Sequence, residues 1–206
     1  MKEIVYAQPF DDQLTNWRAE LEDGGTVAAR DGRLVIDVPG GCTVWFDQLL
    51  EGPVSIEYEA TVIGRDGPND RVSDLNCFWM ARDARDPDSL FAVSRSGQFS
   101  DYNQLRCYYV GYGGNSNTTT RFRRYIGDAE RRPLRPEHDL SANQFMIEPN
   151  RKMSIRCVAD GQRIEYWRDG ELIFSFDDPE PYRSGWFAFR TVTSHIVIEN
   201  FRVTRP

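Results

Sequence analysis

Short runs in which apolar and polar residues alternate dominate this chain, separated by Gly, Pro, Asn and Asp. From Val54 to Ile63 the apolar residues point to one face, and Ser, Glu and Thr point to the other, which is the period of a half-buried strand. Helical periodicity is almost absent, apart from short pieces near residues 86–91 and 136–145. The pattern therefore predicts a protein built from β-strands.

The remaining strands follow the same rule, and their turns are marked by glycine. Asp160-Gly161 and Asp169-Gly170 predict two tight hairpins, and Pro39-Gly40-Gly41 predicts a third. Because the strands follow one another without βαβ units, we predict an all-β fold, a two-sheet antiparallel β-sandwich of the jelly-roll type, as one domain over residues 1–206. We expect strands at Arg33–Val38, Thr43–Phe46, Asn76–Met80, Gln104–Tyr112, Arg121–Tyr125, Lys152–Ala159, Gln162–Arg168, Glu171–Phe176, Gly185–Arg190 and His195–Val203.

Composition narrows the function. The chain has 206 residues and a net charge of −7, which excludes a general affinity for nucleic acid or anionic membranes, because such partners need a basic face. No apolar stretch approaches the roughly 20 residues of a membrane helix. Residues 1–9 lack the apolar core of a signal peptide. We therefore expect a cytoplasmic protein or, if a signal peptide has been removed, a secreted or periplasmic one.

The four cysteines, Cys42, Cys77, Cys107 and Cys157, have no close spacing, and each lies in an apolar run. A free cysteine in such a place behaves as a small hydrophobic residue. We expect reduced, buried thiols, and a disulfide such as Cys77–Cys107 is the alternative.

Two regions carry a resemblance to known families. Residues 152–203 include Ala-Asp-Gly-Gln, Trp-Arg-Asp-Gly-Glu and Gly-Trp-Phe-Ala-Phe-Arg, and they resemble the concanavalin A-like lectin/glucanase superfamily. Residues 108–115 (YYVGYGGN) and 117–125 (NTTTRFRRY) are similar to an uncharacterised bacterial family related to the Bacillus YesU protein. The resemblance implies a jelly roll with a sugar site on a concave sheet face and a setting of polysaccharide degradation. The Glu-x-Asp-x-x-Glu signature of the related glucanases is absent, which argues against their hydrolytic mechanism.

Arginine and tyrosine alternate along the central strands, and their spacing predicts which side chains share a face. In residues 104–112 we expect Arg106, Tyr108 and Tyr112 to face a groove, and Tyr109 to face the core with the other odd-numbered residues. Guanidinium groups pair with carboxylates and aromatic rings stack on sugars, so the groove would suit an acidic glycan. An ordinary solvated strand face is the alternative. The candidate substrate-binding residues are Arg106, Asn115, Arg121, Arg123, Trp186 and Arg190.

Two further segments hold candidate chemistry. Residues 111–120 form a Gly- and Asn-rich loop in which the Asn115 amide could hold a hydroxyl or carboxylate. The alternative is that the loop has only a structural role. The basic stretch 131–138 is interpreted as a solvated loop or as a lid that carries His138 as general base. We interpret His195 as a structural residue.

Metal and cofactor chemistry has little support. Two histidines without a Cys/His grouping do not make a zinc site. Acidic loops at residues 66–74 and 83–88 leave calcium as an alternative, although they lack the spacing of an EF-hand loop. We expect no metal and no cofactor.

These observations predict a carbohydrate-active protein whose partner is an oligosaccharide or polysaccharide with anionic sugars. The favoured function is a lyase that eliminates across a uronate residue, with Tyr108, Tyr112, Tyr125 or His138 as base or acid. A tyrosine acts as a base only where neighbouring cations lower its pKa. The alternatives are a non-catalytic, lectin-like carbohydrate-binding module and a glycoside hydrolase with a carboxylate pair.

Overall fold

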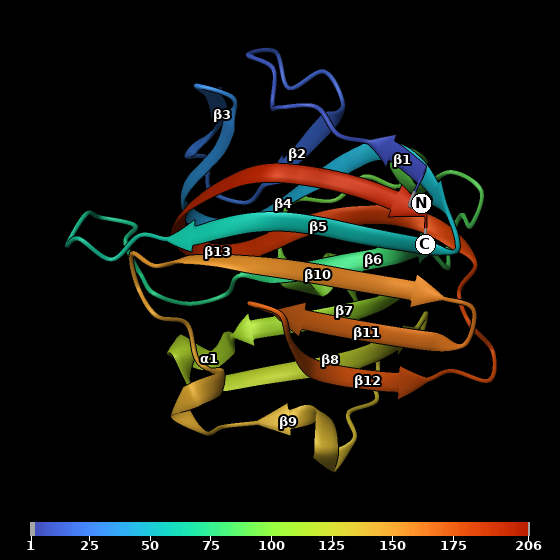
Figure 1. Ribbon diagram of the computed structural model, residues 1–206. Helices are drawn as coiled ribbons and strands as arrows, with labels where there is room; N and C mark the ends of the chain where they lie inside the picture. Colours follow the sequence, from blue (N-terminus) through green and yellow to red (C-terminus); the bar gives the residue numbers. More distant parts are fainter. Residues whose placement is uncertain (1–2, 206) are drawn as a thin grey trace.

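The computed structural model describes residues 3–205 and folds most of them into antiparallel strands, which confirms the predicted all-β class (Figure 1). The strands are β1 (Glu3–Tyr6), β2 (Trp17–Leu21), β3 (Thr26–Arg30), β4 (Arg33–Glu51), β5 (Val54–Val62), β6 (Asn76–Asp83), β7 (Leu105–Gly113), β8 (Thr119–Ile126), β9 (Asp139–Leu140), β10 (Lys152–Asp160), β11 (Arg163–Arg168), β12 (Glu171–Asp177) and β13 (Ser184–Arg205). The helical pieces are Leu90–Ala92, Phe99–Tyr102, α1 (Gly114–Asn117), Pro136–His138 and Asn143–Phe145. No helix within residues 3–205 has the length and apolarity to cross a bilayer.

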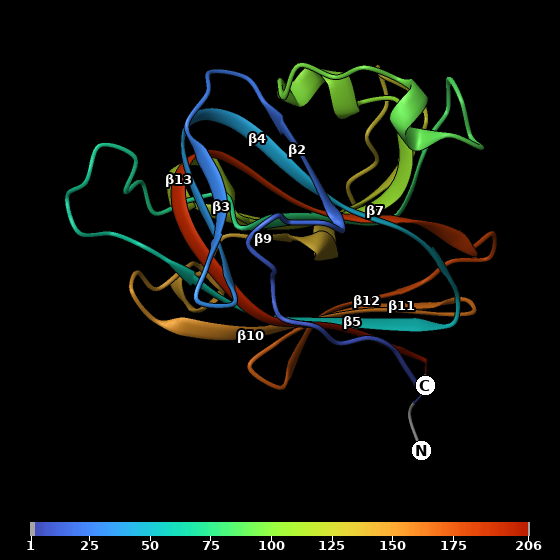
Figure 2. The same cartoon turned by 90° about the horizontal axis from the view of Figure 1, so that it is seen from above.

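The strands form two layers, which Figure 2 shows edge-on. One layer, here named the β5 sheet, has the order β12-β11-β10-β5-β13. The other, the β7 sheet, has the order β13-β6-β7-β8-β9. The long strand β13 belongs to both, since residues 186–190 pair with β6 and residues 196–204 pair with β5. The strand β4 pairs with β13 along both stretches, so the fold is a jelly-roll sandwich whose layers share β4 and β13.

The predicted turn at Pro39-Gly40-Gly41 is wrong. Residues 33–51 form one continuous strand, β4, which pairs with β13 on both sides of this tripeptide. The register shifts between Val192 and Ser194, where Thr193 takes a φ of 44°. This irregularity lets both strands bend from one layer into the other, which is a common use of β-bulges. The two strands predicted within β13 merge for the same reason.

The two Asp-Gly hairpins are confirmed. In the β11–β12 hairpin Arg168 pairs with Glu171, and Asp169 and Gly170 have φ values of 51° and 81°. Positive φ at both central residues matches the right-handed twist of the flanking strands, and glycine adopts it without strain.

The main hydrophobic core lies between the sheets and includes Tyr58, Trp79, Tyr108, Val110 and Phe187. All four cysteines are free and buried, as expected. The alternative Cys77–Cys107 disulfide is not formed, because Cys77 lies in this core and Cys107 lies on the opposite face of the β7 sheet.

A second cluster of buried rings covers part of the outer face of the β7 sheet. Residues 84–104 cross this face and pack Leu90 and Tyr102 against Trp45 and Phe78. Arg95 holds the crossing segment in place, since its guanidinium donates to Asp83 at 3.0 Å and to Glu20 at 3.2 Å. Beside this segment a hollow remains over parts of β7 and β8, and the candidate site lies there.

Candidate functional site

A hollow of about 290 Å³ lies on the outer face of the β7 sheet, beside the segment 84–104. We call it the outer-face pocket. Its floor comes from β6, β7 and β8, and its rim from α1, the helical piece that begins at Phe99 and the loops at residues 74 and 132. The lining residues are Asp74, Asn76, Phe99, Tyr109, Gly111, Gly114, Asn115, Thr119, Arg121, Arg123, Tyr125, Arg132 and Val192.

Strand register brings these side chains to one face. Tyr109 pairs with Arg123 and Gly111 with Arg121, so the odd-numbered residues of β7 and β8 point outward together. The predicted faces of β7 were therefore inverted, because the even-numbered residues point into the core. Alternation in the sequence defines two faces, but it does not show which of them is buried when both carry aromatic residues.

Aromatic rings form one wall of the pocket. The rings of Tyr109 and Tyr125 lie 5.4 Å apart, and the ring of Phe99 meets Tyr109 edge-on at 6.1 Å. The side chain of Tyr109 lies over Gly111, where a Cβ atom would come within 2.7 Å of the phenol oxygen. A glycine at this position therefore makes room for the Tyr109 ring.

The α1 rim is a left-handed turn. Asn115, Ser116 and Asn117 have φ values of 53°, 59° and 60°, a conformation that costs a non-glycine residue energy. The Asn117 amide stabilises it by donating to the Ile147 carbonyl at 2.9 Å and accepting from the Ile147 N–H at 2.8 Å. Asn115 is thereby placed at the pocket edge, where its amide donates to Thr119 at 3.2 Å.

Three arginines line the pocket, and only one of them is ion-paired within residues 3–205. Arg121 donates to both carboxylate oxygens of Asp139, at 2.7 and 3.2 Å. Arg123 donates to the carbonyl of Arg132, and the Arg132 guanidinium lies 5.3 Å from the Phe99 ring. Burial lowers the pKa of Arg123, and the neighbouring charges of Arg132 and Arg121 lower it further. Arg123 and Arg132 thus form a cationic pair that has no carboxylate partner among residues 3–205.

The two phenols of the pocket are protonated at neutral pH. Burial raises the pKa of Tyr125 to about 12, although Arg132 and Arg123 act to lower it. Burial also raises the pKa of Tyr109 well above 10, and the nearby Tyr125 adds to the effect. Both groups are therefore suited to donate hydrogen bonds.

Hydrogen-bond acceptors gather at the other end of the pocket. Asp74 accepts from Arg71 at 2.8 Å and from Ser73 at 2.7 Å through one oxygen, and from the Asn76 amide at 3.3 Å through the other. The side-chain oxygen of Asn76 is buried and has no hydrogen-bond partner among the described residues. Such an atom costs free energy unless a ligand or water donates to it.

The structure brings Asn115, Arg121, Arg123 and Tyr125 together in this pocket. Tyr108 and Tyr112 lie instead in the core between the sheets. The Tyr108 hydroxyl donates to Asp178 at 2.8 Å, and that of Tyr112 donates to the Met146 carbonyl at 3.1 Å. Burial raises the pKa of both phenols, so neither meets the requirement for a base.

Three other predicted residues lie outside the pocket. Arg106 is exposed near the start of β7, where its backbone lies opposite that of Arg82 in β6. Trp186 and Arg190 share the outer face, but the segment 84–104 covers them: Trp186 is in edge contact with Phe91, and Arg190 lies under Phe99. Their faces were as predicted, and the crossing segment removes them from the surface.

His138 lies on the opposite side of β8, in a separate hollow with Phe122 and Phe176. Its ring is 5% exposed, and Nε2 lies 3.3 Å from the Ser175 carbonyl. Burial lowers the pKa of His138. Because it lies on the other side of β8, His138 does not reach the outer-face pocket.

Three lining residues escaped sequence reasoning, Asn76, Phe99 and Val192, whereas Asp74 and Arg132 lie in the segments 66–74 and 131–138 that the sequence singled out for other roles. Asn76 is the first residue of β6, Phe99 begins the helical piece Phe99–Tyr102, and Val192 lies in β13. If the odd-numbered residues of β7 had been assigned to the outer face, Asn76 would have been a candidate, because it lies beside Gly111 on the neighbouring strand β6. No local pattern marks Phe99 or Val192.

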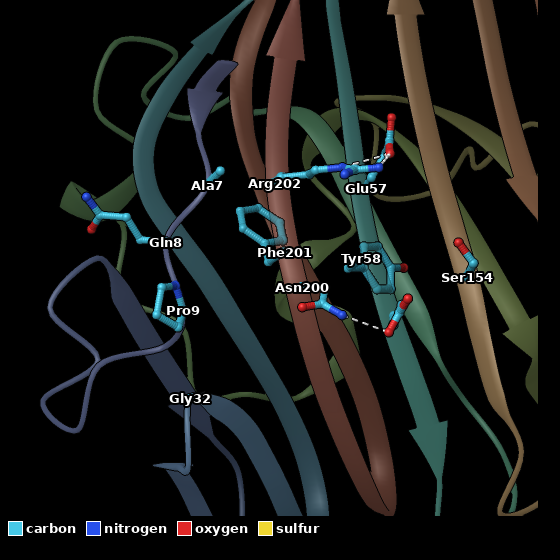
Figure 3. Close-up of a pocket in the computed structure, with 11 residues that line it drawn as sticks. Ala7, Gln8, Pro9, Gly32, Glu57, Tyr58, Ser154, Asn200, Phe201 and Arg202 are labelled. Atoms are coloured by element: carbon cyan, nitrogen blue, oxygen red, sulfur yellow. Dashed lines mark hydrogen bonds and ion pairs between the residues drawn. The ribbon is translucent and has the colours of Figure 1, made fainter.

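A larger hollow, of about 390 Å³, lies on the outer face of the β5 sheet (Figure 3). Its carboxylates already have partners: Glu57 is ion-paired with Arg202, and Glu59 accepts from Asn200 at 2.9 Å. Cross-strand pairs of this kind are usual on an exposed sheet. We therefore favour the smaller outer-face pocket as the functional site.

No cluster of three His, Cys, Asp or Glu residues within 3–205 is arranged to hold a metal ion. His195 contacts Asp70 at 2.9 Å, which fits the structural role expected for it.

Solved structures with this fold include sugar-binding proteins. A protein of unknown function with a galectin-like fold from Bacillus subtilis has a TM-score of 0.76 at 16% identity, over 100% of this chain and 98% of that one. The carbohydrate-binding module CBM66 from Bacillus subtilis has a TM-score of 0.60 at 13% identity, over 91% and 94%. The carbohydrate recognition domain of Emp47p has a TM-score of 0.61 at 14% identity, over 97% and 95%. At these identities the likeness shows the fold alone.

Comparison with curated proteins finds no match. A family model does match, over residues 36–201, which include both sheets and every residue that lines the outer-face pocket. The chain belongs to the family described as Domain of unknown function (DUF6250).

Proposed function

We propose that this chain binds an acidic saccharide in the outer-face pocket. The observation that carries the proposal is the cationic pair of Arg123 and Arg132, which has no carboxylate partner within residues 3–205 and lies beside three aromatic rings. Two neighbouring guanidinium groups repel each other, and a bound carboxylate would relieve that repulsion through bidentate hydrogen bonds. Aromatic rings offer a flat surface to the apolar face of a sugar.

The comparisons support a sugar as the ligand class. The module from Bacillus subtilis and the Emp47p domain are named for carbohydrate binding, and both share the jelly-roll fold. Kinship with the YesU-related family, inferred from residues 108–115 and 117–125, belongs to the same proposal and would set the protein among those that act on uronate-containing polysaccharides.

The experiment is titration calorimetry with oligogalacturonate or oligoglucuronate, using the wild type and Arg123→Gln. We expect the variant to bind at least about tenfold more weakly, since a charge-assisted hydrogen bond is worth about 1.5–3 kcal/mol. Arg163→Gln is the matched control, because Arg163 is exposed and ion-paired with Asp160 on the β10–β11 hairpin. Equal affinity of Arg123→Gln and wild type would refute the proposal.

Elimination across a bound uronate is the second candidate function. It is favoured by Tyr125, whose phenol lies next to Arg123 and Arg132 in the same pocket. With its pKa at about 12, Tyr125 would protonate the leaving oxygen, and the proton beside the uronate carboxyl group would pass to a separate base, for which Asp74 is the carboxylate among the described lining residues. Hydrolysis has less support, because Asp74 is the one carboxyl group among the described lining residues and a glycosidase uses two.

Incubation with oligouronates separates binding from elimination. A lyase would produce an unsaturated uronate with its ultraviolet absorbance, and Tyr125→Phe would abolish the signal. Binding without any rise in absorbance would leave the protein as a carbohydrate-binding module.

A further inference from the structure

The outer-face pocket has donors at one end and acceptors at the other, and the strand register shows this order. Phe78, Tyr109 and Arg123 lie in one row across β6, β7 and β8. Cys77 pairs with Val110, so Asn76 lies in the next outward-facing row, beside Gly111. Successive outward rows on a sheet are about 7 Å apart. Asp74 lies further in the same direction, since its N–H donates to the Gly113 carbonyl at 3.2 Å.

The donor end consists of Arg123 and Arg132 with the protonated phenol of Tyr125. All three groups offer N–H or O–H bonds, and guanidinium groups have no acceptor atom. A carboxylate, which has only acceptor oxygens when ionised, is the matching ligand group.

The acceptor end consists of the side-chain oxygen of Asn76, which has no hydrogen-bond partner within residues 3–205, and the Asp74 carboxylate, whose charge Arg71 balances at 2.8 Å. Arg121 lies in this row, but both of its contacts go to Asp139, which neutralises its charge. An anionic group would place acceptor against acceptor here. Hydroxyl groups, which can donate, satisfy these oxygens instead.

We infer that the pocket selects a sugar residue with a single acidic group, whose carboxylate contacts Arg123 and Arg132 while its ring hydroxyls donate to Asn76 and Asp74. This rests on the proposed function and adds a substrate class to it. A uronate residue has this arrangement, with a carboxylate on one side of the ring and free hydroxyls on the other. A densely sulfated glycan does not, because its hydroxyls are replaced by further anions.

The test compares four chains by titration calorimetry on the wild-type protein, so that no variant has to fold. The chains are an oligouronate, its carboxyl-reduced neutral counterpart, its counterpart methylated on the ring hydroxyls, and a persulfated neutral chain. We expect the oligouronate to bind at least about tenfold more tightly than each of the others.

Two variants test which end of the pocket recognises the carboxylate and which recognises the hydroxyls. Thermal unfolding verifies that each variant is folded. Arg132→Gln should remove the preference for the oligouronate over its carboxyl-reduced form. Asn76→Ala should reduce the preference for free over methylated hydroxyls and leave the carboxylate preference intact.

The failure of this inference differs from the failure of the proposed function. Methylated or persulfated chains that bind as tightly as the oligouronate, while Arg123→Gln still weakens binding, would overturn the inference alone. Absence of any oligouronate binding would overturn both.

Discussion

Single residues decide the shape of the outer-face pocket. Gly111 is the clearest case, because the space that its missing Cβ leaves is filled by the phenol of Tyr109. Sequence alternation placed Tyr109 in the core, and the side chain is indeed only 7% exposed, yet its ring lines the pocket. A tyrosine ring can be almost fully buried and still present one edge to a ligand, and the hydrophobic pattern of the sequence does not distinguish this case from a ring in the core.

Gly111→Ala should displace the Tyr109 ring and weaken oligouronate binding several-fold, with the fold retained. The new Cβ would lie 2.7 Å from the phenol oxygen and 3.1 Å from the ring, so the side chain must shift. Calorimetry measures the affinity, and near-ultraviolet circular dichroism reports the ring environment.

Gly114→Ala is the matched control for this substitution. Gly114 lines the same pocket, but a Cβ there meets its nearest atom, the Thr119 hydroxyl, at 3.5 Å. Equal effects of both alanines would show that the Tyr109 position does not matter for binding.

At the scale of elements, the rim of the pocket depends on the strained α1 turn. Sequence reasoning identified residues 111–120 as a glycine- and asparagine-rich loop near a ligand, and it selected Asn115. The residue that holds the turn is Asn117, whose amide makes two hydrogen bonds to the Ile147 backbone. Ile147 is 30 positions away along the chain, so no local pattern could show this contact.

Asn117→Ala should lower the free energy of unfolding by about 1–3 kcal/mol, because it removes both hydrogen bonds and leaves a buried backbone pair unsatisfied. Denaturant unfolding measures the loss, and calorimetry should show weaker oligouronate binding through the displaced rim.

Ser116→Gly tests whether strain alone accounts for the effect. Ser116 has a φ of 59°, a value that glycine adopts more easily, so this variant should be neutral or slightly more stable. A loss as large as that of Asn117→Ala would mean that any change in the turn is harmful and that the amide has no special role.

At the scale of the whole molecule, the crossing segment 84–104 decides which part of the β7 sheet is open. It covers Trp186 and Arg190 and leaves open only the hollow around Gly111, Arg121 and Arg123. Arg95 attaches it to the sheet through Asp83 and Glu20, and the side chains of Arg95 and Asp83 are fully buried. Sequence reasoning found an arginine- and aromatic-rich face, and it had no means to place this cover.

Arg95→Leu should destabilise the protein by about 3–5 kcal/mol, because it leaves the buried Asp83 carboxylate without one of its charge partners. Thermal or urea unfolding measures the change. Arg163→Gln, which breaks an exposed pair with Asp160, should cost less than about 1 kcal/mol. Similar losses in both variants would contradict a special role for the buried network.

The same network makes stability depend on pH. Burial acts to raise the pKa of Asp83, but hydrogen bonds from Arg85 and the charges of Arg85 and Arg95 outweigh it and lower the pKa below its usual value. A carboxylate with a lowered pKa in the folded state stabilises the protein above the unfolded value, about 3.9, and loses this contribution as the pH falls through the folded pKa. The wild type should therefore lose stability below about pH 4.

The sequence by itself determined the fold class, the two Asp-Gly hairpins and the enrichment of arginine and tyrosine on β7 and β8, because each follows from periodicity and turn chemistry over a few residues. Tertiary structure decided which face of β7 is buried, how β4 and β13 pass between the sheets, and which arginines have carboxylate partners. These features depend on register and on contacts between distant segments, such as Arg121 with Asp139 and Arg95 with Glu20. A local pattern does not contain that information.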